Sequence, residues 1–323
     1  MINPKILGMS LILVAAPASI VANGNSVISG VDKASMMTNQ TPPRNMSIDE
    51  ASAQPVVNTI EVGETPQYLE YNPSNGNIYV SNSDSSDVSV IDSSTNKVIH
   101  TIHIGGAPNV LVYNPSNGNI YVANLYNVSV IDGDTNKVIH AIDGGDSPQF
   151  LEYNPSNGNI YVGNLVDVLV IDSDTNRVIH AISGSGSPSF LEYNPSNDNI
   201  YVTSADDDGS GYLSIIDSDT NEVIHTISVG DNPAFLEYNP SNGNMDMLDF
   251  PKGEPDLNRG DVSEIDSDTN KVIHTVSIRG TPSFLQYNPS NDSIYVGNEG
   301  SRTTYDIAKS VSVIEPTETD SPS

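Results

Sequence analysis

The sequence contains no cysteine and no tryptophan, and only 12 of its 323 residues are lysine or arginine. Without cysteine the protein cannot form disulfides, thiolate metal sites or iron–sulfur clusters, and it has no cysteine nucleophile. Because 41 aspartate and glutamate residues oppose so few cations, the formal net charge is −29. This charge excludes a nucleic-acid-binding protein, since phosphate contacts require clustered lysine and arginine.

Helical periodicity is also missing, and the sequence instead repeats itself. The pentapeptide YNPSN recurs with steps of 42, 40, 40, 45 and 49 residues. Its copies begin at Tyr71, Tyr113, Tyr153, Tyr193, Tyr238 and Tyr287. Periods in the forties indicate a propeller or a helical array. The apolar segments are too short and too often interrupted for helices, which excludes the array.

Each repeat predicts four β-strands. In the second copy they span 109–113, 119–124, 128–132 and 137–142, with the turns NPSNG and DGDTN between them. Proline, asparagine and glycine in these turns favour tight reversals. The segments IYV and VIHAI are apolar in both phases and therefore need cover on both faces. The sequence predicts four-stranded antiparallel blades.

The two ends of the repeat region complement each other. The sixth copy stops after its third strand, while residues 56–66 (VVNTIEVGETP) align with the fourth-strand segment 98–108 (VIHTIHIGGAP). Pairing of residues 56–62 with the last blade would close a ring and remove an exposed sheet edge. We therefore predict an all-β, six-bladed β-propeller domain over residues 55–315.

The units IYVSN, IYVAN, IYVGN and IYVTS, together with the recurring IDSDTN and VIHTI, resemble the YVTN family of β-propeller repeats. The resemblance covers about residues 56–315. It implies a propeller with an exported or cell-surface location, commonly in archaea, and seven blades, the usual number in this family, as the alternative to six. The family's motif residues are structural, so the resemblance implies no catalytic residue.

The chain termini predict export. Lys5 precedes the apolar stretch Ile6–Ala16, and small residues follow, so residues 1–22 are expected to be a signal peptide. An uncleaved N-terminal anchor is the alternative, and otherwise no membrane span is expected. Residues 23–54 are polar and predict a flexible tether, and residues 316–323 a disordered tail. The expected location is extracellular or at the cell surface.

Propeller topology sorts the loops onto two faces. The first and third hairpins of the repeats are nearly identical, whereas the loops between the second and third strands differ in every copy. Variable loops on a rigid scaffold are the usual place of binding. We therefore predict a binding face for a protein or glycan partner. Its candidate residues are Asp206, Asp207, Asp208, Asp246, Lys252, Arg259 and Arg302.

The fifth copy departs most from the repeat. NMDM replaces NIYV, so Asp246 takes the tyrosine position, and Glu264 takes a position that is otherwise valine or isoleucine. Residues 248–261 (LDFPKGEPDLNRGD) look like an insertion before the third strand. Two interpretations stand at this stage, a decayed blade with a loose insertion and a loop that binds a ligand or partner.

The residue before the repeat tyrosine is acidic in four copies. Since first strands line a propeller's channel, Glu70, Glu152, Glu192 and Glu237 are candidates for a carboxylate ring there. Like charges at close range raise each other's pKa or recruit a cation, for which calcium is the candidate. The alternative is solvated side chains too far apart to interact, with no cofactor.

No other pattern predicts catalysis. Five of the six histidines occupy the same place on successive fourth strands, which disperses them around the rim. No nucleotide-binding glycine loop, nucleophile elbow or metalloprotease helix occurs in the sequence. The predicted function is an exported, non-enzymatic scaffold that binds through its variable loops. The alternative is a metal-dependent hydrolase or lactonase-like enzyme with its site in the channel, as in propellers resembling gluconolactonases.

Overall fold

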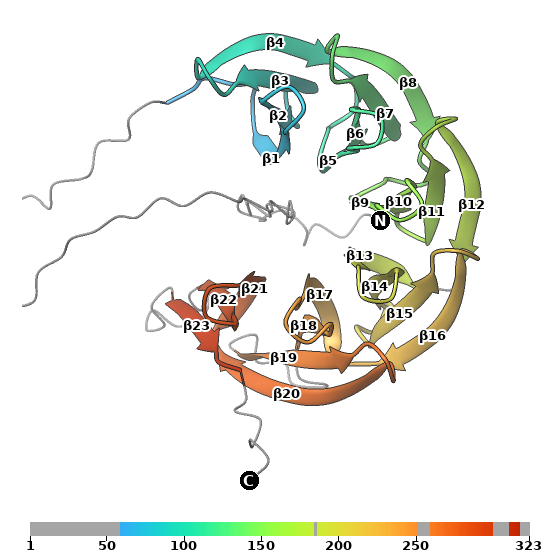
Figure 1. Ribbon diagram of the computed structural model, residues 1–323, viewed down its shortest axis with the longest axis vertical. Coiled ribbons are helices and arrows are strands. Elements are labelled where there is room, and N and C mark those ends of the chain that lie inside the picture. Colours follow the sequence, from blue (N-terminus) through green and yellow to red (C-terminus); the bar gives the residue numbers. More distant parts are fainter. Residues whose placement is uncertain (1–58, 184–185, 251–258, 300–309, 317–323) are drawn as a thin grey trace, which may run out of the picture.

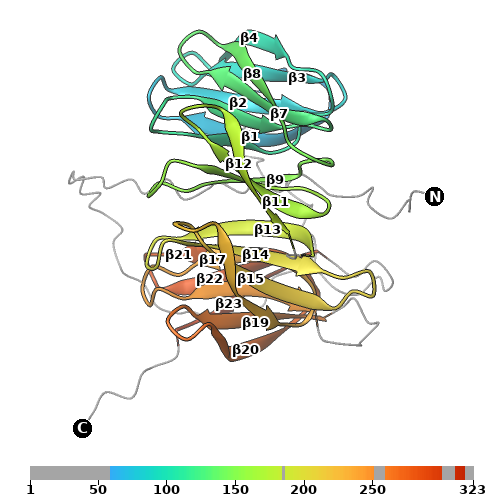
Figure 2. The same ribbon diagram turned by 90° about the vertical axis from the view of Figure 1, so that its right-hand side faces the viewer.

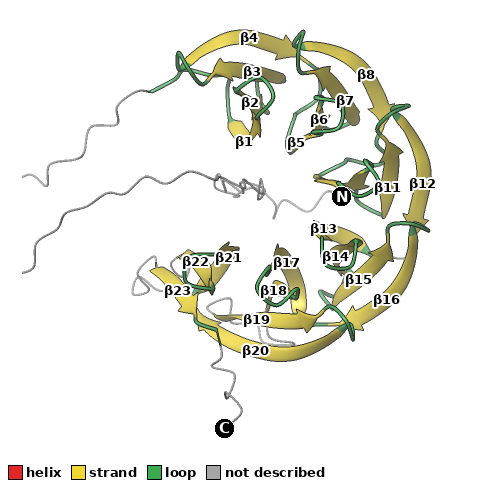
Figure 3. Ribbon diagram, viewed as in Figure 1, coloured by secondary structure: helices red, strands yellow, loops and turns green. Residues whose placement is uncertain are grey.

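The computed structural model describes residues 59–183, 186–250, 259–299 and 310–316. Within these ranges there is no helix, and therefore none that could cross a membrane (Figure 3). The described strands form six sheets, numbered in chain order as blades 1 to 6. Blade 1 contains β1 (Pro66–Asn72), β2 (Asn77–Asn82), β3 (Asp87–Asp92) and β4 (Lys97–His103); blade 2 contains β5 (Leu111–Tyr113), β6 (Ile120–Ala123), β7 (Asn127–Asp132) and β8 (Lys137–Asp143); and blade 3 contains β9 (Phe150–Tyr153), β10 (Ile160–Gly163), β11 (Asp167–Asp172) and β12 (Arg177–Ser183). Blade 4 contains β13 (Ser187–Asn194), β14 (Asn199–Ala205), β15 (Gly211–Asp217) and β16 (Glu222–Ser228); blade 5 contains β17 (Asp231–Tyr238), β18 (Met245–Phe250), β19 (Arg259–Asp266) and β20 (Lys271–Arg279); and blade 6 contains β21 (Thr281–Asn288), β22 (Ser293–Glu299) and β23 (Ser310–Ile314).

These strands form six antiparallel blades, which confirms the predicted β-propeller. Five described blades have four strands and the sixth has three. In each blade the strands follow one another in chain order, with the first nearest the centre of the molecule and the fourth on the outer rim (Figure 1). The blades lie face to face when the molecule is seen from the side (Figure 2).

The apolar core lies between the blades. Five clusters of buried side chains join successive blades, from the junction of blades 1 and 2 to the junction of blades 5 and 6. At the first junction Tyr79 and Val90 of blade 1 lie in one cluster with Leu111, Ile120 and Ile131 of blade 2. In blades 2 to 5 both faces of the middle strands are covered in this way, as their two apolar phases predict.

The repeated turns also fasten each blade to the next. The Tyr79 hydroxyl donates a hydrogen bond to Asn136 Oδ1 in the following blade at 2.7 Å. Asn136 can hold that place in the turn because it adopts the left-handed conformation (φ 55°) that asparagine tolerates. Tyr121 and Tyr161 make the same bond at 2.8 Å to Asn176 and Asn221. The uniform turns are therefore structural.

The closing strand predicted over residues 56–62 is not formed by its described part. Residues 59–62 belong to no strand, and residues 56–58 lie outside the described residues. The chain that follows is held by blade 1 itself, because Thr65 O and Glu64 O accept hydrogen bonds from the backbone N–H groups of Ser83 and Asp84 at 3.0 and 3.3 Å. Blades 1 and 6 consequently stand apart at the two ends of an arc (Figure 1).

The end of the arc exposes apolar side chains that are covered elsewhere. Val311 and Val313 on β23 are 60% and 48% exposed. Val88 and Val90 at the same positions of blade 1 are completely buried against blade 2. The predictions for the signal peptide (1–22), the tether (23–54) and nearly all of the C-terminal tail concern residues outside the described ranges, and they stay predictions.

Candidate functional site

A cavity lies where the link between blades 4 and 5 meets the fifth blade. Its volume is about 280 Å³. It is lined by Ser228, Val229, Gly230, Asp249, Asp261, Ser263, Val272 and Thr275, so two carboxylates and three hydroxyls face it beside two valines. Ser228, Val229 and Gly230 come from the end of β16 and the following link, and the others come from β18, β19 and β20. The cavity therefore belongs to the blade that departs most from the repeat.

The corresponding place in blades 1 and 3 contains an amide opposite an acid. In blade 1, Asn82 Nδ2 donates hydrogen bonds to Asp87 Oδ1 at 2.7 Å and to Ser89 Oγ at 3.0 Å. Asn164 of blade 3 likewise donates to Asp167. The amide group thus supplies the donor that the opposing carboxylate needs, and the pair is satisfied inside its own blade.

In blade 5 a carboxylate replaces this amide. Asp249 is the direct cross-strand partner of Asp261 and is only 3% exposed. Its Oδ2 accepts hydrogen bonds from Gly230 N–H at 3.1 Å and from Ser263 Oγ at 3.4 Å. Burial, and to a lesser degree the charge of Asp261, raises the pKa of Asp249 to about 7.

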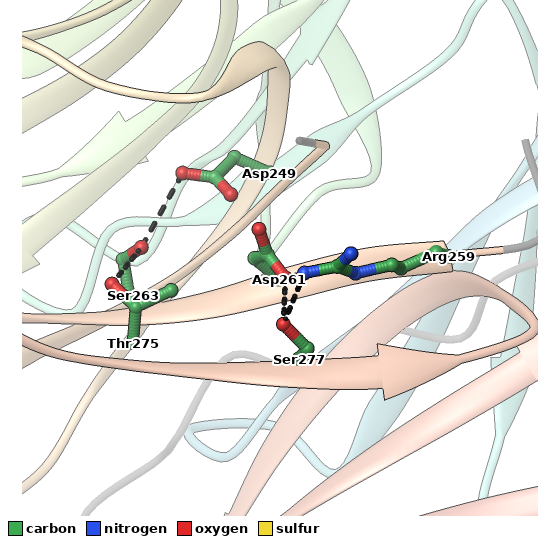
Figure 4. A network of polar contacts seen from close by, with 6 residues as sticks. All are labelled: Asp249, Arg259, Asp261, Ser263, Thr275 and Ser277. Atoms are coloured by element: carbon green, nitrogen blue, oxygen red, sulfur yellow. Dashed lines mark hydrogen bonds and ion pairs between the residues drawn. The ribbon is translucent and has the colours of Figure 1, made fainter. Parts of the chain in front are cut away.

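The carboxylate of Asp261 contacts Ser277 and Arg259 (Figure 4). Its Oδ1 accepts a hydrogen bond from Ser277 Oγ at 2.7 Å and lies 3.7 Å from Arg259 Nη2. Arg259 also donates to Ser277 Oγ at 2.7 Å. Arg259 pairs with Asp261, and the lining of the cavity contains two carboxylates but no lysine, arginine or histidine. Hydrogen-bond acceptors therefore outnumber cationic groups there. This chemistry suits the binding of a cationic or multiply hydrogen-bond-donating group.

One predicted binding loop packs beside this cavity. Asp206, Asp207 and Asp208 are exposed in the turn between β14 and β15. The backbone of that turn accepts hydrogen bonds from the cavity's link at 3.0 Å, from Val229 N–H to Gly211 O and from Asn232 N–H to Gly209 O. The structure thus places the aspartate turn next to the link between the fourth and fifth blades.

The remaining predicted binding residues are placed differently. Arg259 begins β19 and contacts Asp261, as described above. Asp246 is not in a surface loop, because it lies inside β18 and is 7% exposed. Lys252 and Arg302 lie outside the described residues.

The insertion predicted over residues 248–261 is shorter in the structure. Strand β18 continues to Phe250 and β19 starts at Arg259, so only residues 251–258 separate them. Asp249 and Asp261 are therefore paired strand residues and not part of the insertion that the sequence predicted. The usable signal was the alignment of Asp249 with the asparagine that ends IYVSN in the first copy.

The four channel glutamates lie on first strands, on β1, β9, β13 and β17. Glu70 Oε1 accepts a hydrogen bond from Tyr113 N–H in the next blade at 2.9 Å. Glu237 Oε1 accepts one from Tyr287 N–H at 3.0 Å. At least these two carboxylates connect neighbouring blades, a structural role that the sequence did not reveal.

The same four glutamates have raised pKa values. All four are half-buried. Burial raises the pKa of Glu70 and Glu237 to about 7 and that of Glu152 to about 8. Burial first, and then the charges of Glu152 and Glu237, raises the pKa of Glu192. Among the described residues no three acidic or histidine side chains are arranged to hold a metal. The calcium ring stays a prediction.

The histidines of the repeat are on the outer rim. His100, His140, His180, His225 and His274 lie on β4, β8, β12, β16 and β20 and are exposed, as their place on the fourth strands predicts.

No family model and no curated protein matches this chain. Similar solved structures include hydrazine synthase of Kuenenia stuttgartiensis, with 19% identity, a TM-score of 0.61, and 75% of this chain and 76% of that chain covered. The β-propeller domain of Cps50 (Swd1) of Myceliophthora thermophila has 13% identity and a TM-score of 0.58, with 75% and 82% covered. Dihydro-heme d1 dehydrogenase NirN in complex with DHE has 12% identity and a TM-score of 0.56, with 67% and 47% covered. At these identities the similarity shows the propeller fold alone.

Proposed function

We propose that the protein is an exported, non-enzymatic β-propeller scaffold of the YVTN type that binds a protein or glycan partner at the cell surface. The contact is centred on the junction of blades 4 and 5. The observation that carries the proposal is the cavity with Asp249 opposite Asp261, beside the exposed turn of Asp206 to Asp208.

The chemistry of the junction indicates the kind of partner. Carboxylates and hydroxyls accept hydrogen bonds from ammonium, guanidinium and sugar hydroxyl groups. The net charge of −29 attracts cationic partners over a distance and makes their association sensitive to salt. A partner that presents lysine or arginine side chains therefore fits best.

The alternative, a metal-dependent hydrolase in the channel, has less support. The channel carboxylates recur at the same repeat position from blade to blade, as residues of a scaffold do. Two of them also accept backbone N–H groups of the next blade. This use fits a scaffold better than a reactive centre.

The proposal is tested with the labelled full-length chain on arrays of lysine-rich and arginine-rich peptides and of glycans. The test variant combines Asp249→Asn with Asp261→Asn. The control combines Asp167→Asn with Asp174→Asn in blade 3 and changes the net charge equally. We expect binding to weaken at least about tenfold in the test variant, the loss of one charged contact worth about 1.4 kcal/mol.

The control should bind like the unaltered chain. Equal weakening in both variants would assign binding to the overall charge, and an absence of binding on all arrays would contradict the proposal. Hydrolysis of lactones that depends on an added divalent metal would favour the alternative.

A further inference from the structure

A row of three carboxylates crosses the fifth blade. Glu237, Asp246 and Glu264 are successive cross-strand partners on β17, β18 and β19. In blade 3 the same row is Glu152, Tyr161 and Val170. Two apolar core positions that face each other have therefore both become acidic, on a different side of the blade from the cavity at Asp249.

The first of these replacements is buried and incompletely satisfied. Asp246 is 7% exposed, and its Oδ2 has no hydrogen-bond partner. It lies on the same side of β18 as Leu248, which clusters with Ile294 of blade 6. Asp246 thus faces the junction of blades 5 and 6. Its equivalent in blade 3, Tyr161, packs its ring at the junction of blades 3 and 4.

The second replacement is held in position by two amides. Glu264 Oε1 accepts hydrogen bonds from Asn242 Nδ2 at 2.9 Å and from Asn244 Nδ2 at 2.7 Å. These bonds fix the carboxylate beside Asp246 on the neighbouring strand. Side chains of directly opposed strand residues have their Cβ atoms only about 5 Å apart, so the two carboxylates are neighbours.

Two neighbouring carboxylates, one of them almost completely buried, require compensation. Removing a charge from water is costly without a partner, and opposed like charges destabilise a sheet. Burial, and next the charge of Glu264, raises the pKa of Asp246 to about 7. The pair must therefore take up either a proton or a cation, and near neutral pH a proton satisfies it only in part.

We propose that Asp246 and Glu264 bind a divalent cation, Ca²⁺ or Mg²⁺, at the junction of blades 5 and 6. Oxygen ligands suit both ions, and Mg²⁺ is often held by only one or two carboxylates, with water completing its shell. A third carboxylate is not required, which agrees with the absence of a three-residue metal cluster in the described chain.

The test follows thermal unfolding of the full-length chain in EDTA, in CaCl₂ and in MgCl₂, with calorimetry for stoichiometry. The test variant combines Asp246→Asn with Glu264→Gln. The control, Asp174→Asn with Asp219→Asn, removes two exposed hairpin carboxylates. At an ion concentration about a hundred times Kd we expect the unaltered chain and the control to gain about 5 °C or more, with one ion bound per chain. The test variant should show no gain and should unfold at a higher temperature than the unaltered chain in EDTA.

Three outcomes overturn the proposal. The first is a gain retained by the test variant, and the second is no gain with either ion in the unaltered chain, which leaves the pair to a proton alone. The third is a cation-induced rise in melting temperature that Glu70→Gln/Glu152→Gln abolishes and the test variant keeps. This result would assign the ion to the channel. Should the test variant not fold, Asp246→Tyr with Glu264→Val introduces the residues that blade 3 has at these positions and answers the same question.

Discussion

Blades 3 and 5 have the same four-strand topology but use their polar positions in opposite ways. In blade 3, Asn164 donates to Asp167, and Tyr161 donates to Asn221 of blade 4. In blade 5 the residues equivalent to Asn164 and Tyr161 are Asp249 and Asp246, which bring acceptors where blade 3 has donors. The repeat residues of blade 3 pair a donor with an acceptor, whereas blade 5 places one carboxylate opposite another at both positions.

The largest effect is expected when blade 3 receives the acidic pair of blade 5. Tyr161→Asp with Val170→Glu removes a buried ring from the core and introduces two carboxylates there. Loss of a buried aromatic side chain alone costs about 3–5 kcal/mol, and the charges add to it. We expect the chain to lose its cooperative unfolding transition in urea.

The milder Tyr161→Phe variant serves as the reference for this experiment. It removes only the hydroxyl bond to Asn221 and should cost about 1 kcal/mol. If the double variant were no less stable than Tyr161→Phe, the junctions between blades would not depend on this packing.

The reverse change gives blade 5 the residue of blade 3. Asp249→Asn introduces the amide found in blades 1 and 3, which can donate to Asp261. The pKa of Asp249 is raised to about 7 in the folded chain, so its ionisation lowers stability progressively as the pH rises from about 4 to about 7. We expect the variant to be about 2 kcal/mol more stable at pH 8 and equal to the unaltered chain at pH 4, at 1.4 kcal/mol per pKa unit reduced for relaxation.

Urea unfolding at both pH values measures this difference. Asp167→Asn in blade 3 is the control and should give no gain at pH 8, because its carboxylate already has an amide donor. A pH-independent effect of Asp249→Asn would show that its charge is not the cause.

The channel should give a smaller effect in the same direction. The pKa of Glu152 is raised to about 8 by burial, so this group favours folding below about pH 4.5 and loses that contribution as the pH rises through 8. Glu152→Gln keeps an acceptor for the backbone N–H of Tyr193. We expect the melting temperature to rise by a few degrees at pH 9 and to stay unchanged at pH 4.

The smallest effect is expected at the open end of the arc. Val313→Lys on the exposed β23 should change stability by less than about 0.5 kcal/mol, as at an ordinary surface position. Val130→Lys, its equivalent at the buried junction of blades 2 and 3, should be severely destabilising. Equal damage in chemical unfolding would mean that β23 is covered and the ring closed.

The sequence was sufficient to predict the blades because each repeat contains all the local signals for its strands and turns. Tyr79 and Asn136 are a case in point: both recur, yet only the structure shows that they bond across a junction. The closing strand could not be decided from the pattern of residues 56–62, since strand pairing depends on the distance between the two ends. Asp249 was not predicted as a strand residue because NMDMLD in blade 5 no longer resembles NIYVSN, so the end of β18 could not be located from the repeat.

The proposed binding site is tested most directly by hydrogen–deuterium exchange of the full-length chain, alone and with the tightest-binding peptide or glycan from the arrays. We expect slower exchange in residues 206–211 and 228–232, around the junction of blades 4 and 5. Exchange in the uniform turns, such as residues 114–118 and 154–158, should not change. Protection confined to those turns, or to the first strands that line the channel, would contradict the assignment of binding to this junction.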